Sequence, residues 1–213
     1  EKDDDPDNEL FLQYQPIINL KTGSIFGFEA LARLKTKKLG LVPPLEFIPL
    51  AEKTKLIIPI GEKIIVQAVN FLSKLKLIGY EDICISINIS PIQLMKNDFT
   101  CRLLKIMEEL NVNPRNIVIE ITESTFASNY KVVNSIIEKL RKVGLHIAID
   151  DFGTGYSTLA RISELNVDFM KIDKLFVDKL LSGDINKAIT SDIIYMSLKL
   201  GQYTIAEGVD NIN

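Results

Sequence analysis

The sequence is poor in cysteine and histidine, with two cysteines and one histidine among 213 residues. Cys84 and Cys101 form no CxxC pair and lie apart from any second ligand cluster, which argues against a disulfide framework and a thiolate metal site. We therefore expect both to be reduced thiols in the core of a cytoplasmic protein. The lone histidine, His146, begins a predicted strand and is expected to have a structural role.

Long apolar runs and a basic charge excess are also lacking. No apolar run approaches the length of about 20 residues that a membrane span needs. The 25 basic and 28 acidic residues give a net charge of -3, so duplex nucleic acid would gain no bulk electrostatic attraction. A hydrophobic fraction of 46% indicates a folded chain, and 213 residues suffice for one α/β barrel. The acidic residues 1–9 include no hydrophobic signal region and are interpreted as a linker.

Short apolar runs rich in β-branched residues alternate with helical patterns, which is typical of βα units around a parallel sheet. The predicted strands cover residues 11–18, 25–32, 83–89, 116–122, 146–150, 169–172 and 203–207. Helices are predicted over residues 62–77 and 130–143, with Gly79, Gly144 and Gly201 where helices end. Only NLKTGS separates the first two strands, so they should pair as an antiparallel hairpin.

Polar side chains recur along one face of these strands and at their carboxyl ends. In ICISINIS the isoleucines alternate with Cys84, Ser86 and Asn88, which gives one apolar face and one small, polar face. GFEALAR and IVIEIT show the same alternation. The active site of an α/β barrel lies at the carboxyl ends of its strands. The residues predicted to share this rim are Glu29, Asn88, Glu120, Asp150, Asp151, Lys171 and Glu207.

The composition of this rim predicts a metal site. Carboxylate and amide oxygens suit hard cations such as Mg²⁺ or Mn²⁺, and so many acids together would repel one another without a cation. The adjacent Asp150 and Asp151 could hold two ions about 3.5 to 4 Å apart, the separation used for phosphoryl displacement. For Glu29 or Glu120 taken alone, a solvated strand end is the simpler interpretation. The whole set favours a site.

Seven stretches of the chain, taken in order, carry a specific resemblance. They are GFEALAR, PLEFIPLAEKTKLI, SINISPIQL, IEITES, AIDDFGTGYSTL, FMKIDKLFV and AEGVD. Together, from about Tyr14 to the end, they resemble the EAL-domain family of cyclic di-GMP phosphodiesterases. The resemblance implies an α/β fold, a TIM-like (β/α)8 barrel whose first strand is antiparallel. We expect residues 10–213 to form an EAL-type phosphodiesterase domain that ends before its last βα unit.

The resemblance also implies an activity in bacterial second-messenger signalling. A metal-activated water would hydrolyse cyclic di-GMP to linear pGpG, with Mg²⁺ or Mn²⁺ as cofactor and two ions per site. The positions that match metal ligands are Glu29, Asn88, Glu120, Asp150 and Asp151. The positions that match catalytic residues are Lys171, Glu207 and Asp151, of which Lys171 and Glu207 orient and activate the water. Gln15, Leu31 and Arg33 match substrate contacts, and Glu123 matches a glutamate that steadies the loop after the paired aspartates.

Two other functions remain open at this point. One is a receptor or scaffold domain that binds cyclic di-GMP with weak or no turnover; the other is a Mg²⁺-dependent barrel enzyme with a different phosphate or carboxylate substrate. Asp210 stands where the family usually has glutamate. The resemblance further implies a homodimer formed through the helix after DFGTGYS. The acidic start suggests an upstream sensory or cyclase domain.

Overall fold

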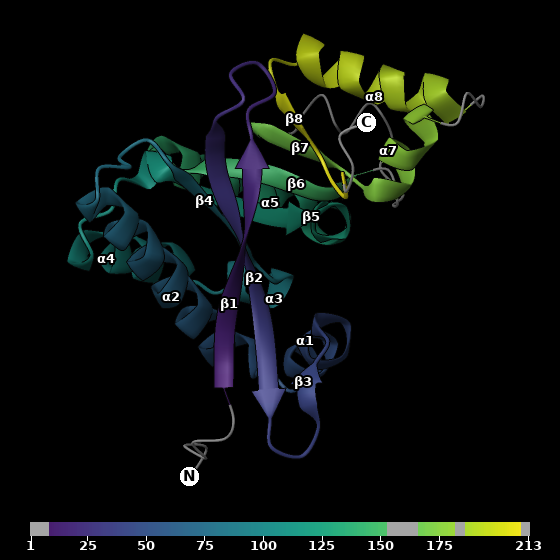
Figure 1. The fold of residues 1–213 in the computed structure, drawn as a ribbon. Helices are drawn as coiled ribbons and strands as arrows, with labels where there is room; N and C mark the ends of the chain where they lie inside the picture. Colours follow the sequence, from purple (N-terminus) through teal and green to yellow (C-terminus); the bar gives the residue numbers. More distant parts are fainter. Residues whose placement is uncertain (1–8, 153–165, 182–185, 210–213) are drawn as a thin grey trace. The chain divides into compact units, whose positions relative to one another are not determined.

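The computed structural model describes residues 9–152, 166–181 and 186–209. The chain divides into two compact units, Glu1–Val118 and Ile119–Asn213, which join within strand β5 (Ile117–Thr122). Both units contain helices and strands, as Figure 1 shows. A bilayer-spanning helix is absent from the described ranges.

The first unit is built on a long antiparallel hairpin. Strand β1 (Glu9–Ile18) pairs with β2 (Ile25–Thr36), and the short β3 (Gly40–Val42) pairs with the far end of β2. On its other side β2 runs parallel to β4 (Cys84–Asn88). The predicted hairpin is confirmed. Strand β3 was not predicted, because three residues are too few to show a hydrophobic period.

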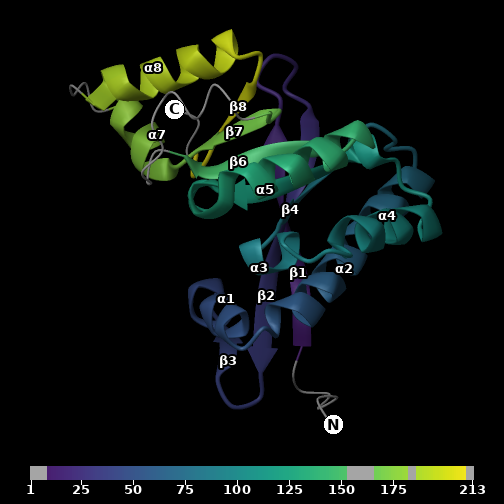
Figure 2. The same cartoon turned by 180° about the vertical axis from the view of Figure 1, so that it is seen from behind.

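The helices of the first unit are α1 (Pro44–Lys53), α2 (Ile57–Leu77), α3 (Pro91–Leu94) and α4 (Phe99–Glu109), followed by the 3₁₀ turn η1 (Pro114–Asn116). They lie on one side of the hairpin, in front of it in Figure 2. Helix α2 begins before the predicted residue 62, because Pro59 is tolerated in a first helical turn. Phe71 of α2 stacks on Tyr14 of β1 with ring centroids 3.7 Å apart, and Gln67 donates a hydrogen bond to the Leu10 carbonyl.

The two cysteines differ in their surroundings. Cys84 is buried as predicted, and burial, with a smaller contribution from Asp82, raises the pKa of its thiol to about 11. The prediction of a core position was wrong for Cys101, which is exposed on α4. This helix buries Phe99, Leu103 and Met107. A residue two positions after Phe99 falls on the opposite side of a helix, where solvent lies.

In the second unit, strands β5, β6 (His146–Phe152), β7 (Phe169–Ile172) and β8 (Tyr203–Ala206) follow one another in the sheet. Strand β7 runs parallel to both β6 and β8. The helices are α5 (Glu123–Lys142), α7 (Lys174–Leu181) and α8 (Asn186–Lys199). Helix α5 starts before the predicted residue 130 because two helical segments meet at a kink at Asn129. Gly79, Gly144 and Gly201 have positive φ just after helices, as predicted.

Asp168 holds the amino-terminal ends of three strands together. Its carboxylate accepts a hydrogen bond of 2.7 Å from Arg141 and one of 2.9 Å from the Ile147 N–H, and His146 Nδ1 lies 3.7 Å away. Its carbonyl accepts a bond from the Tyr203 N–H. Partial burial alone would raise the pKa of Asp168, but hydrogen bonds from His146, Ile147 and Arg141 outweigh burial and lower it. His146 therefore has the structural surroundings that were predicted.

We expect Asp168→Asn to lower the free energy of unfolding by about 1 to 3 kcal/mol at neutral pH, because it removes a partly buried charged acceptor. Since the folded-state pKa is depressed, this contribution is present above the unfolded value of about 3.9. It is lost as the pH falls through the folded value. Urea unfolding at a series of pH values should show the wild type and the variant converging in acid.

Asp98→Asn provides the matched control. Asp98 forms an exposed pair with Arg102 one helical turn away, and the hydrogen bond from Arg102 lowers the pKa of Asp98 as well. Solvent screens such a pair, so we expect its loss to change stability much less. Two results would contradict the anchoring role of Asp168. One is an equal loss of unfolding free energy in the two variants; the other is a lower unfolding free energy of Asp168→Asn than of the wild type that persists at acid pH.

Candidate active site

Lys171 is the centre of an acidic cluster in the second unit. It lies in β7, and its side chain is only 2% exposed. Its ammonium nitrogen is 2.8 Å from Glu120 Oε2, 3.1 Å from Asp150 Oδ1 and 2.8 Å from Glu207 Oε1. Asp150 lies in β6 and Glu207 follows β8, the two strands that flank β7, whereas Glu120 comes from β5. The structure thus brings together four of the residues predicted for the rim.

The charges of this cluster do not balance. With Asp151 included, four carboxylates face one ammonium, which leaves three negative charges in excess when all are ionised. A buried ammonium is stable only when acceptors replace its lost water, and the three nearest carboxylates do so. Coulomb repulsion among the four acids remains. A cation is the partner that relieves it.

Asp150, Asp151 and Glu207 each offer a carboxylate oxygen, and these oxygens all lie within 4.8 Å of one another. Neighbouring residues in a regular strand point to opposite faces, so the convergence of Asp150 and Asp151 needs a local cause. The pairing of β6 with β7 shifts between Ile149 and Phe152, and Asp151 has a φ of 55°, in the left-handed region. Such irregularities redirect side chains next to active sites. A donor set made only of oxygens suits Mg²⁺, Mn²⁺ or Ca²⁺.

Two further predicted ligands contact each other in the first unit. The side-chain amide of Asn88 donates a hydrogen bond of 2.8 Å to Glu29 Oε1. Glu29 is half-buried on β2 and lies opposite Ser86 of β4 in the parallel pairing, so Asn88 at the end of β4 is within reach. The strand register therefore places a carboxylate and an amide side by side, as their alternation in the sequence predicts.

The loop that follows Asn88 is held by contacts that the sequence analysis missed. Ser90 and Gln93 form a capping box at the start of α3, and the Ser90 hydroxyl donates a 2.5 Å bond to Glu52 of α1. The buried Gln93 side chain packs against Gly61 of α2, where a Cβ would lie 1.8 Å from Gln93 Nε2. The S-x-x-Q pattern is a readable signal for the capping box. The contact with Gly61 leaves no pattern in the sequence.

The residues predicted to contact substrate lie on the hairpin of the first unit. Gln15 of β1 is directly opposite Glu29 of β2, and residues 29, 31 and 33 of a strand share one side. Gln15, Leu31 and Arg33 are therefore grouped on the side that carries Glu29. Arg33 donates hydrogen bonds to Gln13 Oε1 at 2.8 Å and to the Ala32 carbonyl at 2.9 Å.

Glu123, predicted to steady the loop after the paired aspartates, is the first residue of α5 and is 5% exposed. Most of that loop, DFGTGYS, lies in residues 153–165, outside the described residues. The start of the helix predicted to mediate a dimer and Asp210 lie outside them as well. The roles assigned to these positions stay predictions.

Two curated relatives match nearly the whole chain. Cyclic di-GMP phosphodiesterase PdeR of Escherichia coli K12 is 32% identical over 204 residues, which are 96% of this chain and 31% of PdeR. The bifunctional diguanylate cyclase/cyclic di-GMP phosphodiesterase MucR of Pseudomonas aeruginosa is 34% identical over 202 residues, which are 95% of this chain and 30% of MucR. The chain thus spans about a third of the length of these relatives.

A solved structure of the PaMucR phosphodiesterase in complex with c-di-GMP has the same fold. It is 34% identical in sequence, with a TM-score of 0.89 over 95% of this chain and 82% of that chain. This similarity confirms the predicted TIM-like α/β fold, and the pairing of β1 with β2 confirms that the first strand is antiparallel. The sequence pattern of the EAL domain matches residues 6–213. The chain therefore belongs to the EAL domain family.

Proposed function

We propose that this chain hydrolyses one phosphodiester bond of cyclic di-GMP to give linear pGpG. Membership of the EAL domain family supports the proposal, as do the names of PdeR and MucR and the c-di-GMP complex of PaMucR. One observation carries it: oxygens of Asp150, Asp151 and Glu207 lie within 4.8 Å of one another, beside the buried ammonium of Lys171. Cleavage of a phosphodiester with water needs such a combination of cation ligands and a fixed positive charge.

Mg²⁺ or Mn²⁺, with two ions per site, is the proposed cofactor. The ligands would be Glu120, Asp150 and Asp151 of the second unit, together with Glu29 and Asn88 of the first. All five offer oxygen donors, which fits a hard divalent cation. When bound, two such ions supply Lewis acidity, which neutralises charge on the phosphate and acidifies the attacking water.

Lys171 and Glu207 are the proposed pair that orients this water. The ammonium of Lys171 is held by three carboxylates and is almost fully buried, so its position is fixed before substrate arrives. A fixed N–H donor holds the water oxygen at the phosphorus without competing for the metal. Glu207 is the most exposed of the three partners, at 27%, and its carboxylate can accept a proton from the water.

Arg33 is proposed to bind the substrate phosphate. Its planar guanidinium offers a fork of N–H donors, and its present acceptors, the Gln13 amide oxygen and a backbone carbonyl, are both uncharged. A phosphate oxygen would be a stronger acceptor than either. Gln15 and Leu31, on the same side of the hairpin, would contact the rest of the cyclic dinucleotide. Glu123 would steady the loop after Asp151.

The alternative is a cyclic di-GMP receptor or scaffold with weak or no turnover. A domain that only binds the nucleotide has no need of the metal ligands or of Lys171, yet this chain has the expected residue type at each of these positions. This favours hydrolysis. The homodimer, the upstream sensory or cyclase domain and the cytoplasmic location remain predictions; a chain that spans a third of its relatives is consistent with additional domains.

Lys171→Met tests the role of the ammonium, because methionine keeps the apolar stem and removes the charge. We expect kcat for pGpG formation to fall about 10²- to 10³-fold, the usual cost of losing one fixed donor at developing charge. Mn²⁺ affinity, measured by calorimetry, should not fall, since a positive charge leaves the acidic cluster. Lys105→Met is the control: this side chain is 75% exposed on α4, and its loss should leave kcat unchanged.

Glu29→Ala tests whether the first unit contributes a metal ligand. We expect Mn²⁺ affinity to fall at least about tenfold and turnover to be lost, because removal of even an indirect metal contact costs 10- to 100-fold. The circular dichroism spectrum and the melting temperature should stay close to those of the wild type. Unchanged Mn²⁺ affinity would remove Glu29 from the ligand set.

Assays of the unaltered chain separate the candidate functions. Hydrolysis predicts pGpG formation with Mg²⁺ or Mn²⁺ and none with a chelator. Binding of cyclic di-GMP by calorimetry, without product under either metal, would establish the receptor. Affinity no greater than for unrelated nucleotides would rule out both and favour an enzyme with another substrate.

A further inference from the structure

The backbone around Glu207 is bonded to the segment where β7 passes into α7. The Glu207 N–H donates to the Ile172 carbonyl at 3.1 Å, which continues the pairing of Ile172 with Ala206. On the other side of Glu207, the Gly208 carbonyl accepts a hydrogen bond of 2.8 Å from the Lys174 ammonium. These two bonds hold the peptide unit that precedes the Glu207 Cα and the one that follows the Gly208 Cα, so they bracket Glu207 and Gly208.

Gly208 permits this arrangement because it has no side chain. Its φ is +67°, a conformation that L residues rarely adopt. A Cβ at this position would lie 2.5 Å from Cδ and 2.6 Å from Cγ of Lys174. The aliphatic stem of Lys174 therefore packs directly on the Gly208 backbone, and its ammonium reaches the carbonyl of the same residue.

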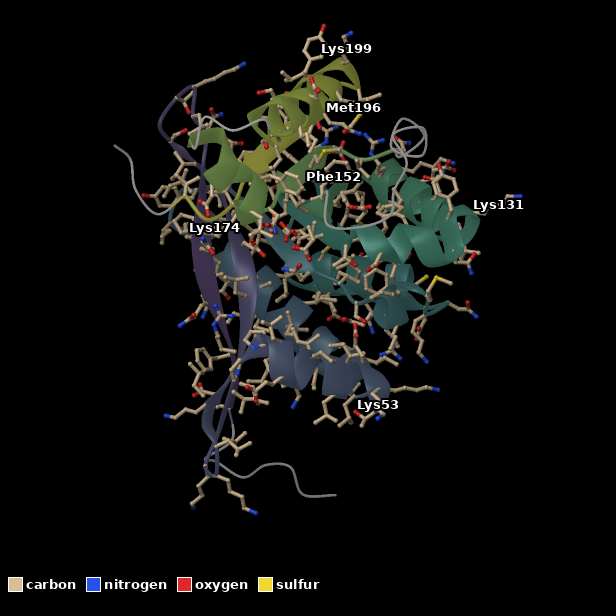
Figure 3. All side chains as sticks on the ribbon, turned by 90° about the vertical axis from the view of Figure 1, so that its right-hand side faces the viewer. Lys53, Lys131, Phe152, Lys174, Met196 and Lys199 are labelled. Atoms are coloured by element: carbon tan, nitrogen blue, oxygen red, sulfur yellow. The ribbon has the colours of Figure 1, made fainter. Side chains whose placement is uncertain are left out.

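Lys174 is itself placed firmly relative to Lys171. It is the first residue of α7 and follows Lys171 by three positions; Figure 3 labels it. Asp173 caps this helix: its side chain accepts a bond of 2.7 Å from the Leu175 N–H, and its carbonyl accepts one from Phe176. Strand β7 and the cap fix the start of α7, so the Lys174 side chain begins from a rigid position.

Among the three carboxylates that contact Lys171, Glu207 depends most on its backbone for its position. The exposed fractions of the side chains are 0% for Glu120, 14% for Asp150 and 27% for Glu207. Surrounding atoms hold the first two in place. Glu207 also follows the last residue of β8, where the ladder of strand hydrogen bonds ends.

We propose that Lys174 is a positioning residue that holds Glu207 against Lys171. The idea rests on the proposed function, in which Glu207 and Lys171 orient the attacking water. Lys174 would act through the bond from its ammonium to the Gly208 carbonyl and through the packing of its stem on the Gly208 backbone. Its ammonium also lies 3.3 Å from Asp178 Oδ1, an exposed pair one helical turn away that the proposed role does not require.

Three substitutions separate the effects of the Lys174 ammonium, of its packing stem and of its ion pair with Asp178. Lys174→Met keeps the packing stem and removes the ammonium, Lys174→Arg keeps a charged donor of similar reach, and Asp178→Asn removes only the helical ion pair. We expect Lys174→Met to lower kcat for pGpG formation about 3- to 10-fold, the range that loss of one exposed hydrogen bond gives. KM should change less than about twofold, because the proposed substrate contacts lie on other strands. Lys174→Arg should restore kcat, and Asp178→Asn should match the wild type.

Hydrogen exchange supplies a measurement that does not depend on activity. In a peptide covering residues 203–209, Lys174→Met should speed exchange of the amides around Glu207, whereas Asp178→Asn should not. Accelerated exchange with unchanged kcat would mean that Lys174 holds the loop without serving the site, and would overturn the proposal. Unchanged exchange, failure of arginine to restore kcat, or an equal effect of Asp178→Asn would overturn it as well. If the wild type proved inactive, the proposed function would fail, and exchange would still decide whether Lys174 holds the loop.

Discussion

The buried ammonium of Lys171 is the constraint on which the second unit depends. The Lys171 side chain is 2% exposed, so its ammonium is tolerated only if acceptors replace its water. The three carboxylates that do so come from three different strand ends. A shift of β5, β6 or β8 by one residue would turn its acid to the other face of the sheet and remove one of the three acceptors of the ammonium. The register of the strands and the chemistry of the site are thus fixed by the same contacts.

The opposite end of the same strands has its own ionic anchor. Asp168 precedes β7 and binds Arg141 and the start of β6, while Lys171, three residues later, binds the acids at the other end. Strand β7 is only four residues long, so its backbone pairing alone would fix its position weakly. A charged group near each end, each with several partners, makes sliding costly in either direction. The anchor therefore contributes to the geometry of the rim without contacting it.

The sequence predicts well the strands and the four side chains that meet at Lys171 in the second unit, because alternation along a strand reports directly which side chains share a face. It predicts the starts of α2 and α5 poorly: Pro59 and the kink at Asn129 hide the first turns of these helices. Cys101 shows that a helical pattern alone is weak evidence for burial. Two features depend on the path of the backbone: the packing of Gln93 on Gly61 and the left-handed conformation of Asp151. Neither leaves a periodic pattern in the sequence. The clustering of Glu120, Asp150 and Glu207 around Lys171 could therefore be predicted from the sequence, but the contacts that hold the backbone in place could not.

The number of protons on Lys171 limits how it can act. An ammonium has three N–H donors, and three carboxylates lie within 3.1 Å of it. To orient a water molecule, as we propose, Lys171 must release one of them. Glu120 is fully buried and would be left without this partner, at high cost in free energy, whereas Glu207 is the most exposed of the three. Glu207 is therefore the partner whose hydrogen bond to Lys171 gives way to the water. The backbone next to Glu207, which Lys174 holds, keeps its carboxylate beside that water.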